Sequence, residues 1–333
     1  MSRSLRIAPG AASSPESPQV SVLVPVRNAA RWLRHALGDL LAEQSVTLEI
    51  VAVDDHSTDR SAEVLAAFAT ADPRVRVVKA RGRGIAAALE AALGESRAPW
   101  IGVMEADDRC HPDRFAWLTR SLAAHPGWDG VVSRTTLLGA RSNGMDRYLA
   151  WQNALLEPGD LARERFVEIP ALLQTGLFAR ALIERVGGFR EPPSWPTDID
   201  FWMRVFASGA RIGRVPRKLY RWRQHPRQDT RTSERHGLEA IQRCKAHYFV
   251  CGPARGRAID LVSVGRTLAT WESLLAAEGA TDVRAIAWKP SMRDAPARRD
   301  GAVRVFVYGM RPVREQIRAR ISTWDDALDW FAA

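Results

Sequence analysis

The stretch VSVLVPVRN (20–28) decides the fold. Its first seven residues are mostly apolar and rich in β-branched valine, and a polar turn follows, which is typical of a strand buried on both faces. Similar apolar runs then alternate with helical stretches. We expect strands at 20–26, 48–53, 75–79, 100–104 and 130–134, and helices at 30–43, 59–70, 84–94 and 112–125. This alternation predicts an α/β fold with a mostly parallel central sheet and flanking helices.

The pattern loosens after about residue 145. There we expect helices at 178–186, at 197–206 (TDIDFWMRVF) and at 234–248. After Cys251-Gly252-Pro253 a strand at 303–308 and an Arg-rich helix at 312–321 indicate one βα unit of a small α/β module. The spacing of Gly256 and Gly265 does not favour a phosphate loop. We therefore predict a disordered tail (1–18), a large α/β domain (19–250) and a small C-terminal α/β domain (251–333).

Composition limits the classes of function. The 333 residues carry a net charge of +10, which suits phosphorylated substrates, nucleic acid or an acidic membrane surface. The basic residues are scattered, so we do not expect nucleic-acid binding. Three cysteines without metal-ligand spacing indicate a reducing compartment. Because neither a membrane-spanning run nor a signal peptide is evident, we expect a cytoplasmic protein, and peripheral contact with the inner membrane face stays open.

Acidic residues follow two of the expected strands. Asp54 and Asp55 end the second strand, where ligands bind in parallel sheets. Glu105, Asp107 and Asp108 follow the fourth strand and make a hard-oxygen site that suits Mg²⁺ or Mn²⁺. The structural alternatives are a capped polar turn for the first group and a favourable charge at a helix N-terminus for the second.

Further candidates lie in the second half of the chain. Asp198 and Asp200 stand among apolar residues, which can raise a carboxylate pKa toward that of a useful base, although either residue could simply cap the helix. His225 could bind a metal or a phosphate, or be an ordinary loop residue. Guanidinium groups match phosphate oxygens, and four arginines surround His225: Arg221, Arg223, Arg227 and Arg231.

These motifs occur in a fixed order, and together they resemble the family-two inverting glycosyltransferases with the GT-A fold. The similarity covers about residues 20 to 235. The C-terminal part of the chain is similar to a β-1,3-N-acetylglucosaminyltransferase-like subgroup through VRVFVYG and an expected terminal Trp-containing helix. The ordered set comprises VSVLVPVRN, VDDHSTD, MEADD followed by HPDRF, VGGF, TDIDFWMR and YRWRQHP.

The resemblance implies transfer of a hexosyl or N-acetylhexosaminyl group from a nucleotide diphosphate sugar, with a UDP-sugar favoured, to a hydroxyl of a glycan or lipid-linked acceptor. It implies Asp198 as general base and a Mn²⁺ or Mg²⁺ cofactor. The implied metal-binding set is Glu105, Asp107, Asp108 and His225. The implied nucleotide-binding set is Pro25, Val26, Arg27, Asp54, Asp55, Gly84 and Asp107.

Two departures from the family pattern leave an alternative open. Glu105 replaces the aspartate that usually opens the acidic motif, which keeps the charge. Leu89 and Glu90 replace the usual Arg-Asn pair, which removes a guanidinium and an amide from the nucleotide site. The alternative is therefore a nucleotide-sugar-binding or scaffold protein with impaired catalysis. The sequence predicts neither the donor sugar nor the oligomeric state.

Overall fold

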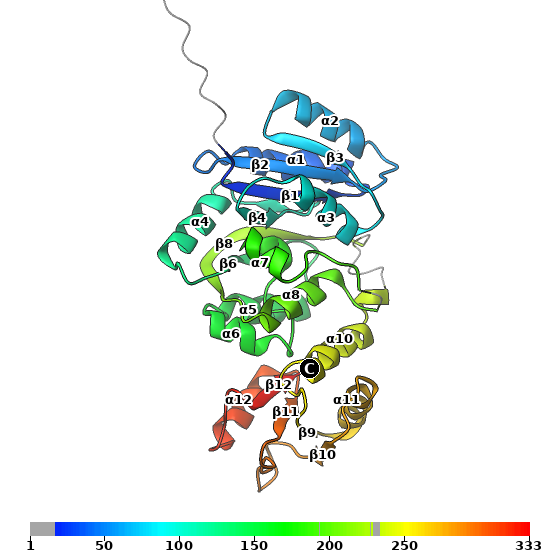
Figure 1. Ribbon diagram of the computed structural model, residues 1–333, viewed down its shortest axis with the longest axis vertical. Coiled ribbons are helices and arrows are strands. Elements are labelled where there is room, and N and C mark those ends of the chain that lie inside the picture. Colours follow the sequence, from blue (N-terminus) through cyan, green and yellow to red (C-terminus); the bar gives the residue numbers. More distant parts are fainter. Residues whose placement is uncertain (1–16, 193, 227, 229–233) are drawn as a thin grey trace, which may run out of the picture.

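The structure is a computed structural model that describes residues 17–192, 194–226, 228 and 234–333. It contains an eight-stranded sheet and a separate four-stranded sheet, stacked along the long axis of the molecule (Figure 1). The strand order of the large sheet is β3-β2-β1-β4-β7-β6-β8-β5. The expected tail and the arginines at 227 and 231 lie wholly or largely outside the described residues.

The first half of the large sheet is parallel, as its alternating pattern predicts. Strands β1 to β4 are parallel, because a helix after each of β1, β2 and β3 returns the chain to the same edge of the sheet. The elements are β1 (Val20–Val26), α1 (Ala30–Leu41), β2 (Leu48–Asp54), α2 (Ser61–Ala71), β3 (Val75–Lys79), α3 (Ile85–Glu95) and β4 (Trp100–Val103).

The second half of the large sheet is mixed. Strand β7 pairs antiparallel with β4 and β6, and β5 pairs antiparallel with β8, while β6 and β8 are parallel. The elements are β5 (Arg109–Cys110), α4 (Arg114–Ala124), β6 (Gly130–Gly139), α5 (Asn143–Ala154), α6 (Pro158–Glu164), η1 (Leu173–Thr175), β7 (Gly176–Ala179), α7 (Arg180–Arg185), α8 (Thr197–Ala207), β8 (Ile212–Gln224), η2 (Glu234–His236) and α10 (Leu238–Cys251).

The expected helix at 178–186 is wrong at its start. Phe178 is fully buried in β7, opposite Ile101 of β4, and the helix begins only at Arg180. The strand is four residues long, too short to show a periodicity that could be distinguished from that of the following helix. The polar run after Tyr220 also begins as strand, because β8 continues to Gln224.

The C-terminal sheet is larger than one βα unit. Its four strands are all parallel and run in the order β10-β9-β11-β12. The expected terminal Trp-containing helix is wrong, because the segment around Trp330 pairs with β11 as a strand. The elements are β9 (Ile259–Ser263), α11 (Gly265–Ala277), β10 (Val283–Ala287), β11 (Val303–Val307), α12 (Arg311–Arg320) and β12 (Asp329–Ala332).

One hydrophobic cluster joins helix α8 to the C-terminal sheet. Ile199 and Met203 of α8 pack in the same buried cluster as Phe249 of α10 and Trp271 of α11. Helix α10 runs between the two parts (Figure 1). The helix that carries Asp198 is therefore packed partly against the C-terminal part.

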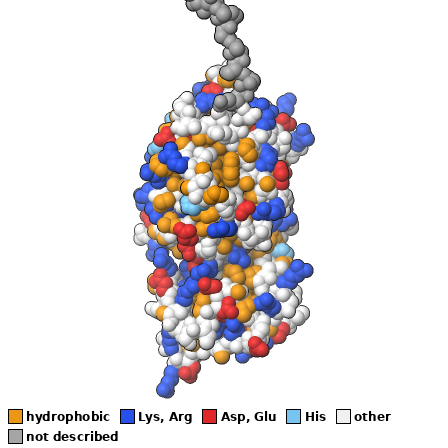
Figure 2. Space-filling model, turned by 60° about the vertical axis from the view of Figure 1, so that its left-hand side comes forward, with side chains coloured by type: hydrophobic (Ala, Val, Ile, Leu, Met, Phe, Trp, Pro, Cys, Tyr) orange, Lys and Arg blue, Asp and Glu red, His pale blue; other side chains and the backbone are white. Residues whose placement is uncertain are grey.

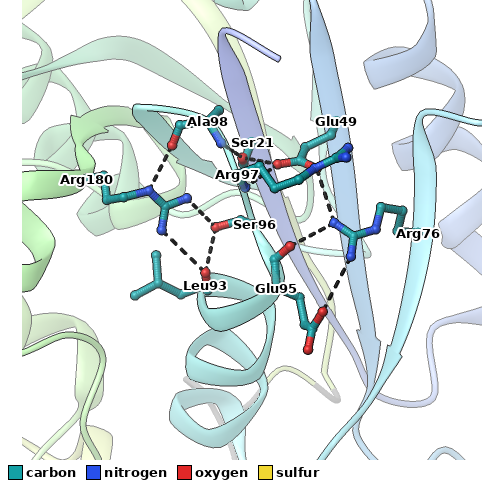
Figure 3. Close-up of polar contacts among 9 residues, drawn as sticks. All are labelled: Ser21, Glu49, Arg76, Leu93, Glu95, Ser96, Arg97, Ala98 and Arg180. Carbon is teal, nitrogen blue, oxygen red and sulfur yellow. Dashed lines mark hydrogen bonds and ion pairs between the residues drawn. The ribbon is translucent and has the colours of Figure 1, made fainter. Parts of the chain in front are cut away.

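A buried carboxylate fastens the amino ends of the central strands (Figure 3). Glu49 accepts hydrogen bonds from the Ser21 hydroxyl at 2.6 Å and from the Arg97 amide at 2.5 Å, and Arg76 lies 3.3 Å away. Burial alone would raise the Glu49 pKa, but these hydrogen bonds and the Arg97 charge hold it below its ordinary value. This edge is structural, and it leaves the opposite, carboxyl edge for ligands.

The face in Figure 2 shows Lys and Arg side chains spread among hydrophobic and acidic ones, with no single basic block. Within the described ranges, no helix combines the length and the apolar character needed to cross a membrane.

Candidate functional site

The first group of candidate residues lies at the carboxyl ends of β1 and β2. Asp55 is buried, and its Oδ2 accepts a hydrogen bond of 3.0 Å from the Gly84 amide at the start of α3. Arg27 Nη1 lies 3.7 Å from the same oxygen, and its side chain is exposed. A carboxylate, a backbone turn and an exposed guanidinium thus come together beside a helix N-terminus, which suits a phosphorylated ligand.

Polar side chains from the second loop hold the first loop in place. The Asn28 side chain accepts a hydrogen bond of 2.7 Å from the Thr58 amide, and Asn28 itself has a positive φ of 50°. Asp59 accepts a hydrogen bond from the Ala30 amide, so it satisfies the first turn of α1. The VDDHSTD motif therefore has a structural part, Thr58 and Asp59, and a part that faces the ligand edge, Asp55.

The second group joins the acidic motif to the end of β8. His225 Nε2 lies 2.8 Å from Asp107 Oδ2, and the Arg223 amide donates to Asp108 Oδ1 at 2.6 Å. Arg223 Nε also donates to the Asp107 carbonyl. Asp107 and His225 are 118 residues apart in the sequence, and the pairing of β5 with β8 brings them together.

Asp108 has the environment of a cation ligand. Its Oδ2 is buried and has no hydrogen-bond partner among the described residues. Burial, followed by the charge of Asp107, raises the Asp108 pKa well above its ordinary value, against the opposing effects of Arg223 and Tyr220. A buried carboxylate oxygen without a donor is costly, and a divalent cation would relieve that cost.

Protein ligands alone would not complete the coordination shell. The described residues contain no group of three or more His, Cys, Asp or Glu side chains arranged to hold a metal ion. Mg²⁺ and similar ions are commonly bound by one or two carboxylates together with substrate phosphates and water. Asp107 and Asp108 fit that pattern.

Two aromatic residues of this group are missed by the sequence patterns. Trp32 of α1 stacks on the His225 ring at a centroid distance of 4.5 Å, and Arg223 lies over Trp32. The Tyr220 hydroxyl accepts a hydrogen bond of 3.3 Å from the Glu105 amide, so Tyr220 supports the acidic loop. Trp32 lies in an amphipathic helix, where its position alone gives no sign of a ligand role.

In the third group, the two aspartates of α8 have different surroundings. Asp200 is buried and accepts hydrogen bonds from Arg190, Arg204, Tyr248 and Trp195. Asp198 is only partly buried, and the hydrogen bond described for it comes from the next backbone amide, that of Ile199. Burial raises the Asp198 pKa and nearby Glu168 adds to this effect, while His236 opposes it. Asp200 is a structural residue, whereas Asp198 has a base-like environment.

Contacts connect the α8 region to the first group. A Cβ on Gly84 would lie 3.0 Å from Glu191 Oε2, and Glu191 also pairs with Arg235. Glu90 of α3 accepts a hydrogen bond from the Phe189 amide in the VGGF turn, and Leu89 is fully buried in the core. Of the two residues that replace the family's Arg-Asn pair, Glu90 thus holds the VGGF turn between α7 and α8, and Leu89 packs in the core.

The first half of the chain is similar to proteins of a known family. Residues 21–147 match the family model for glycosyl transferase family 2. The chain contains a family 2 glycosyltransferase domain. It is 40% identical to the succinoglycan biosynthesis protein ExoO of Rhizobium meliloti over 177 residues, 53% of this chain and 47% of the relative. It is 31% identical to ExoU of the same organism over 205 residues, 58% of each chain. The chain thus spans about half the length of these curated relatives.

Solved structures support the same fold. The chain superposes on S. aureus TarS 1-349 in complex with UDP-GlcNAc, with a TM-score of 0.58, 16% identity and coverage of 78% of this chain and 71% of that one. A mannosyltransferase from Pyrobaculum calidifontis in complex with GDP-Man and Mn²⁺ gives a TM-score of 0.50 at 22% identity, with 80% and 71% coverage. The GT-A fold expected from the sequence is confirmed, together with a second, small parallel sheet.

Proposed function

We propose that this chain is an inverting glycosyltransferase that moves a sugar from a UDP-sugar to a hydroxyl of a glycan or lipid-linked acceptor. The observation that carries the proposal is the pair of aspartates in α8. Asp200 is held by four donors, whereas Asp198, two residues earlier, has a raised pKa and one hydrogen bond from its own helix turn. That contrast is expected of a general base placed on a rigid support.

In this proposal the first group binds the nucleotide. Pro25 and Val26 end β1 and Arg27 follows them, beside Asp54 and Asp55, and Asp55 is held by the Gly84 amide. The fixed carboxylate of Asp55 accepts from the imide of a uracil base, which favours uridine. The exposed Arg27 guanidinium is free to swing toward phosphate oxygens. Neither Leu89 nor Glu90 reaches into this group, so their departure from the family pattern does not require loss of donor binding.

The reaction is a single displacement. Asp198 takes the proton from the acceptor hydroxyl as that oxygen bonds to the anomeric carbon, and the bond from this carbon to the donor phosphate oxygen breaks. Attack from the face opposite the leaving diphosphate inverts the anomeric centre. Of the four residues expected from the sequence, Glu105, Asp107, Asp108 and His225, we propose that Asp107 and Asp108 would hold Mn²⁺ or Mg²⁺ together with donor phosphates. When bound, the metal would offset the charge that builds on the leaving diphosphate.

Replacing Asp198 by Asn tests the proposal. We expect the Asp198→Asn variant to lose transfer by at least about a hundredfold, because general-base catalysis contributes at that level, while UDP-sugar affinity stays within about twofold. Nucleotide release from a UDP-sugar with Mn²⁺ and a polysaccharide-repeat acceptor gives the rate, and calorimetry gives the affinity. Retained transfer would refute the role of Asp198.

A second candidate function is a nucleotide-sugar-binding protein with impaired catalysis. The observation that favours it is Glu90, whose carboxylate holds the VGGF turn where the family has an amide. Such a protein would bind the UDP-sugar with equal affinity before and after the Asp198→Asn change, and would release no nucleotide in either form. The names of ExoO and ExoU support a place in polysaccharide biosynthesis and hence the transferase.

A further inference from the structure

Helix α1 carries a large aromatic residue outside its buried face. The buried face packs on the large sheet through Leu33, Ala36, Leu37 and Leu40. Trp32 lies beside that face. It is half-buried, and it belongs to none of the hydrophobic clusters in the described part of the chain. The packing of the core therefore does not explain the position of this indole.

Asp39 shows where this side of α1 points. Trp32 and Asp39 are about two helical turns apart, so their side chains lie on the same stripe of the helix. Asp39 accepts two hydrogen bonds from the Arg109 guanidinium, at 2.5 and 2.7 Å, and one of 3.0 Å from the Cys110 amide. Both partners form β5, which directly follows the acidic motif. The helix is thus fastened to the edge that carries this motif, which fixes Trp32 beside it.

The indole of Trp32 contacts two residues at the end of β8. Its ring stacks on the His225 ring, with 4.5 Å between the centroids and 28° between the planes. The central carbon of the Arg223 guanidinium lies 5.8 Å from the Trp32 ring centroid. Residues 223 and 225 are two positions apart, and alternate side chains along a strand point to the same face. One ring can therefore hold both residues, by stacking and by cation–π attraction.

These two residues are the ones that hold the acidic motif. His225 Nε2 lies 2.8 Å from Asp107 Oδ2. Arg223 donates from its amide to Asp108 Oδ1 and from its Nε to the Asp107 carbonyl. In the proposed function the two carboxylates bind the cation. Replacing a residue that holds a metal ligand in this way typically costs about 10- to 100-fold in metal affinity or activity.

We propose that Trp32 is a positioning residue of the transferase site. It fixes His225 and Arg223, and through them it orients the carboxylates of Asp107 and Asp108 toward the cation and the donor diphosphate. This role requires no contact between Trp32 and the metal or the donor. The inference rests on the proposed function, because it assumes that the two carboxylates bind the metal together with donor phosphates.

The test measures the affinity of the full chain for UDP by titration calorimetry, once with Mn²⁺ and once with EDTA. Trp32→Leu removes the aromatic face and keeps an apolar side chain, whereas Trp32→Phe keeps an aromatic face. The control is Trp117→Leu in α4. Trp117 is also partly buried beside the core of the large sheet, and its described cation partners, Arg120 and Arg217, lie outside the acidic motif.

We expect Trp32→Leu to weaken UDP binding by about tenfold or more when Mn²⁺ is present, and by less than about twofold in EDTA. Trp32→Phe and Trp117→Leu should keep both affinities within about threefold of wild type. Urea denaturation of each variant shows that it is folded. Trp32→Gln, which puts a helix-favouring residue at this half-exposed position, is a second variant and should behave as Trp32→Leu does.

A double variant tests whether Trp32 acts through His225. In a His225→Ala background, Trp32→Leu should weaken UDP binding with Mn²⁺ by a smaller factor than it does alone. An undiminished loss in that background would overturn the proposal. An equal loss with Mn²⁺ and in EDTA would overturn it as well, because Trp32 would then support the nucleotide end of the sheet as a whole.

The wild-type titrations separate this inference from the proposed function. Wild-type protein that binds UDP no better with Mn²⁺ than in EDTA would refute the metal site of the proposed function, and the role of Trp32 with it. Wild-type protein that binds UDP better with Mn²⁺, together with a Trp32→Leu variant that does so to the same extent, would refute only the role of Trp32.

Discussion

Asp200 holds together a network that involves two arginines and a tyrosine. Its carboxylate lies 2.7 Å from Arg204 Nε, and Arg204 is itself nearly buried and donates to the Gly188 carbonyl. Replacing Asp200 by Asn leaves the Arg204 charge buried without its counter-ion. We expect a loss of about 3 kcal/mol in the free energy of unfolding, measured by urea denaturation. The matched Asp198→Asn variant should lose less than about 1 kcal/mol; equal losses would contradict the distinction between the two aspartates.

The raised pKa of Asp198 predicts the pH dependence of transfer. A base must be ionised to accept a proton, and burial together with Glu168 shifts this ionisation to higher pH. The acid limb of kcat/KM should therefore lie above the ordinary aspartate value of about 3.9. Glu168→Gln removes a like charge and should move this limb to lower pH. Rate profiles of both proteins check the prediction, and an unshifted limb in the variant would contradict it.

For single residues, the sequence predicts which side chains are candidates for the site better than it predicts their contact partners. The carboxylates at 55, 107, 108 and 198 follow from their positions after strands or before a helix. Their partners do not, because His225 reaches Asp107 only through the pairing of β5 with β8, and Gly84 reaches Asp55 through a crossover. Trp32 carries no local signal, and Glu90 stands out only as a departure from the family pattern, since the contacts of both depend on long-range packing.

Among the elements, the turn between α7 and α8 shows how a short motif connects distant parts. Gly187 and Gly188 both have positive φ, but a Cβ on Gly187 meets open space, whereas one on Gly188 would meet the Glu90 carboxylate. Both Gly→Ala changes cost about 1–2 kcal/mol in backbone strain. Gly188→Ala should cost about 1 kcal/mol more, because it displaces Glu90 from the Phe189 amide.

The double variant separates strain from contact in this turn. In a Glu90→Ala background the extra cost of Gly188→Ala should disappear, while Gly187→Ala should cost the same as before. Unfolding free energies of the three single variants and the two double variants give the coupling. A Gly188→Ala cost that is independent of residue 90 would show that the carboxylate does not hold the turn.

Element prediction succeeds where periodicity is long and fails where strands are short. The βα repeats from β1 to β4 are predicted within a few residues, because buried parallel strands and amphipathic helices differ clearly in pattern. Strand β7 has four residues and β12 has four, and each derives its identity from its neighbours in the sheet. The C-terminal sheet is underestimated for the same reason, since β10 is largely exposed and lacks an apolar run.

For the molecule as a whole, the shared core predicts that the two sheets unfold together. Trp271 of α11 is fully buried in the cluster that also contains Ile199 and Met203 of α8. Trp271→Ala should lower the free energy of unfolding by about 3–5 kcal/mol, and the loss should extend to the region of Asp198. Calorimetry of the full chain, with and without UDP, measures both effects. We expect a single transition that moves down in the variant and is still raised by UDP. Two transitions in the variant, of which the first does not respond to UDP and the second lies at the wild-type temperature, would contradict the prediction. They would mean that the two parts unfold independently and that the C-terminal part does not support α8.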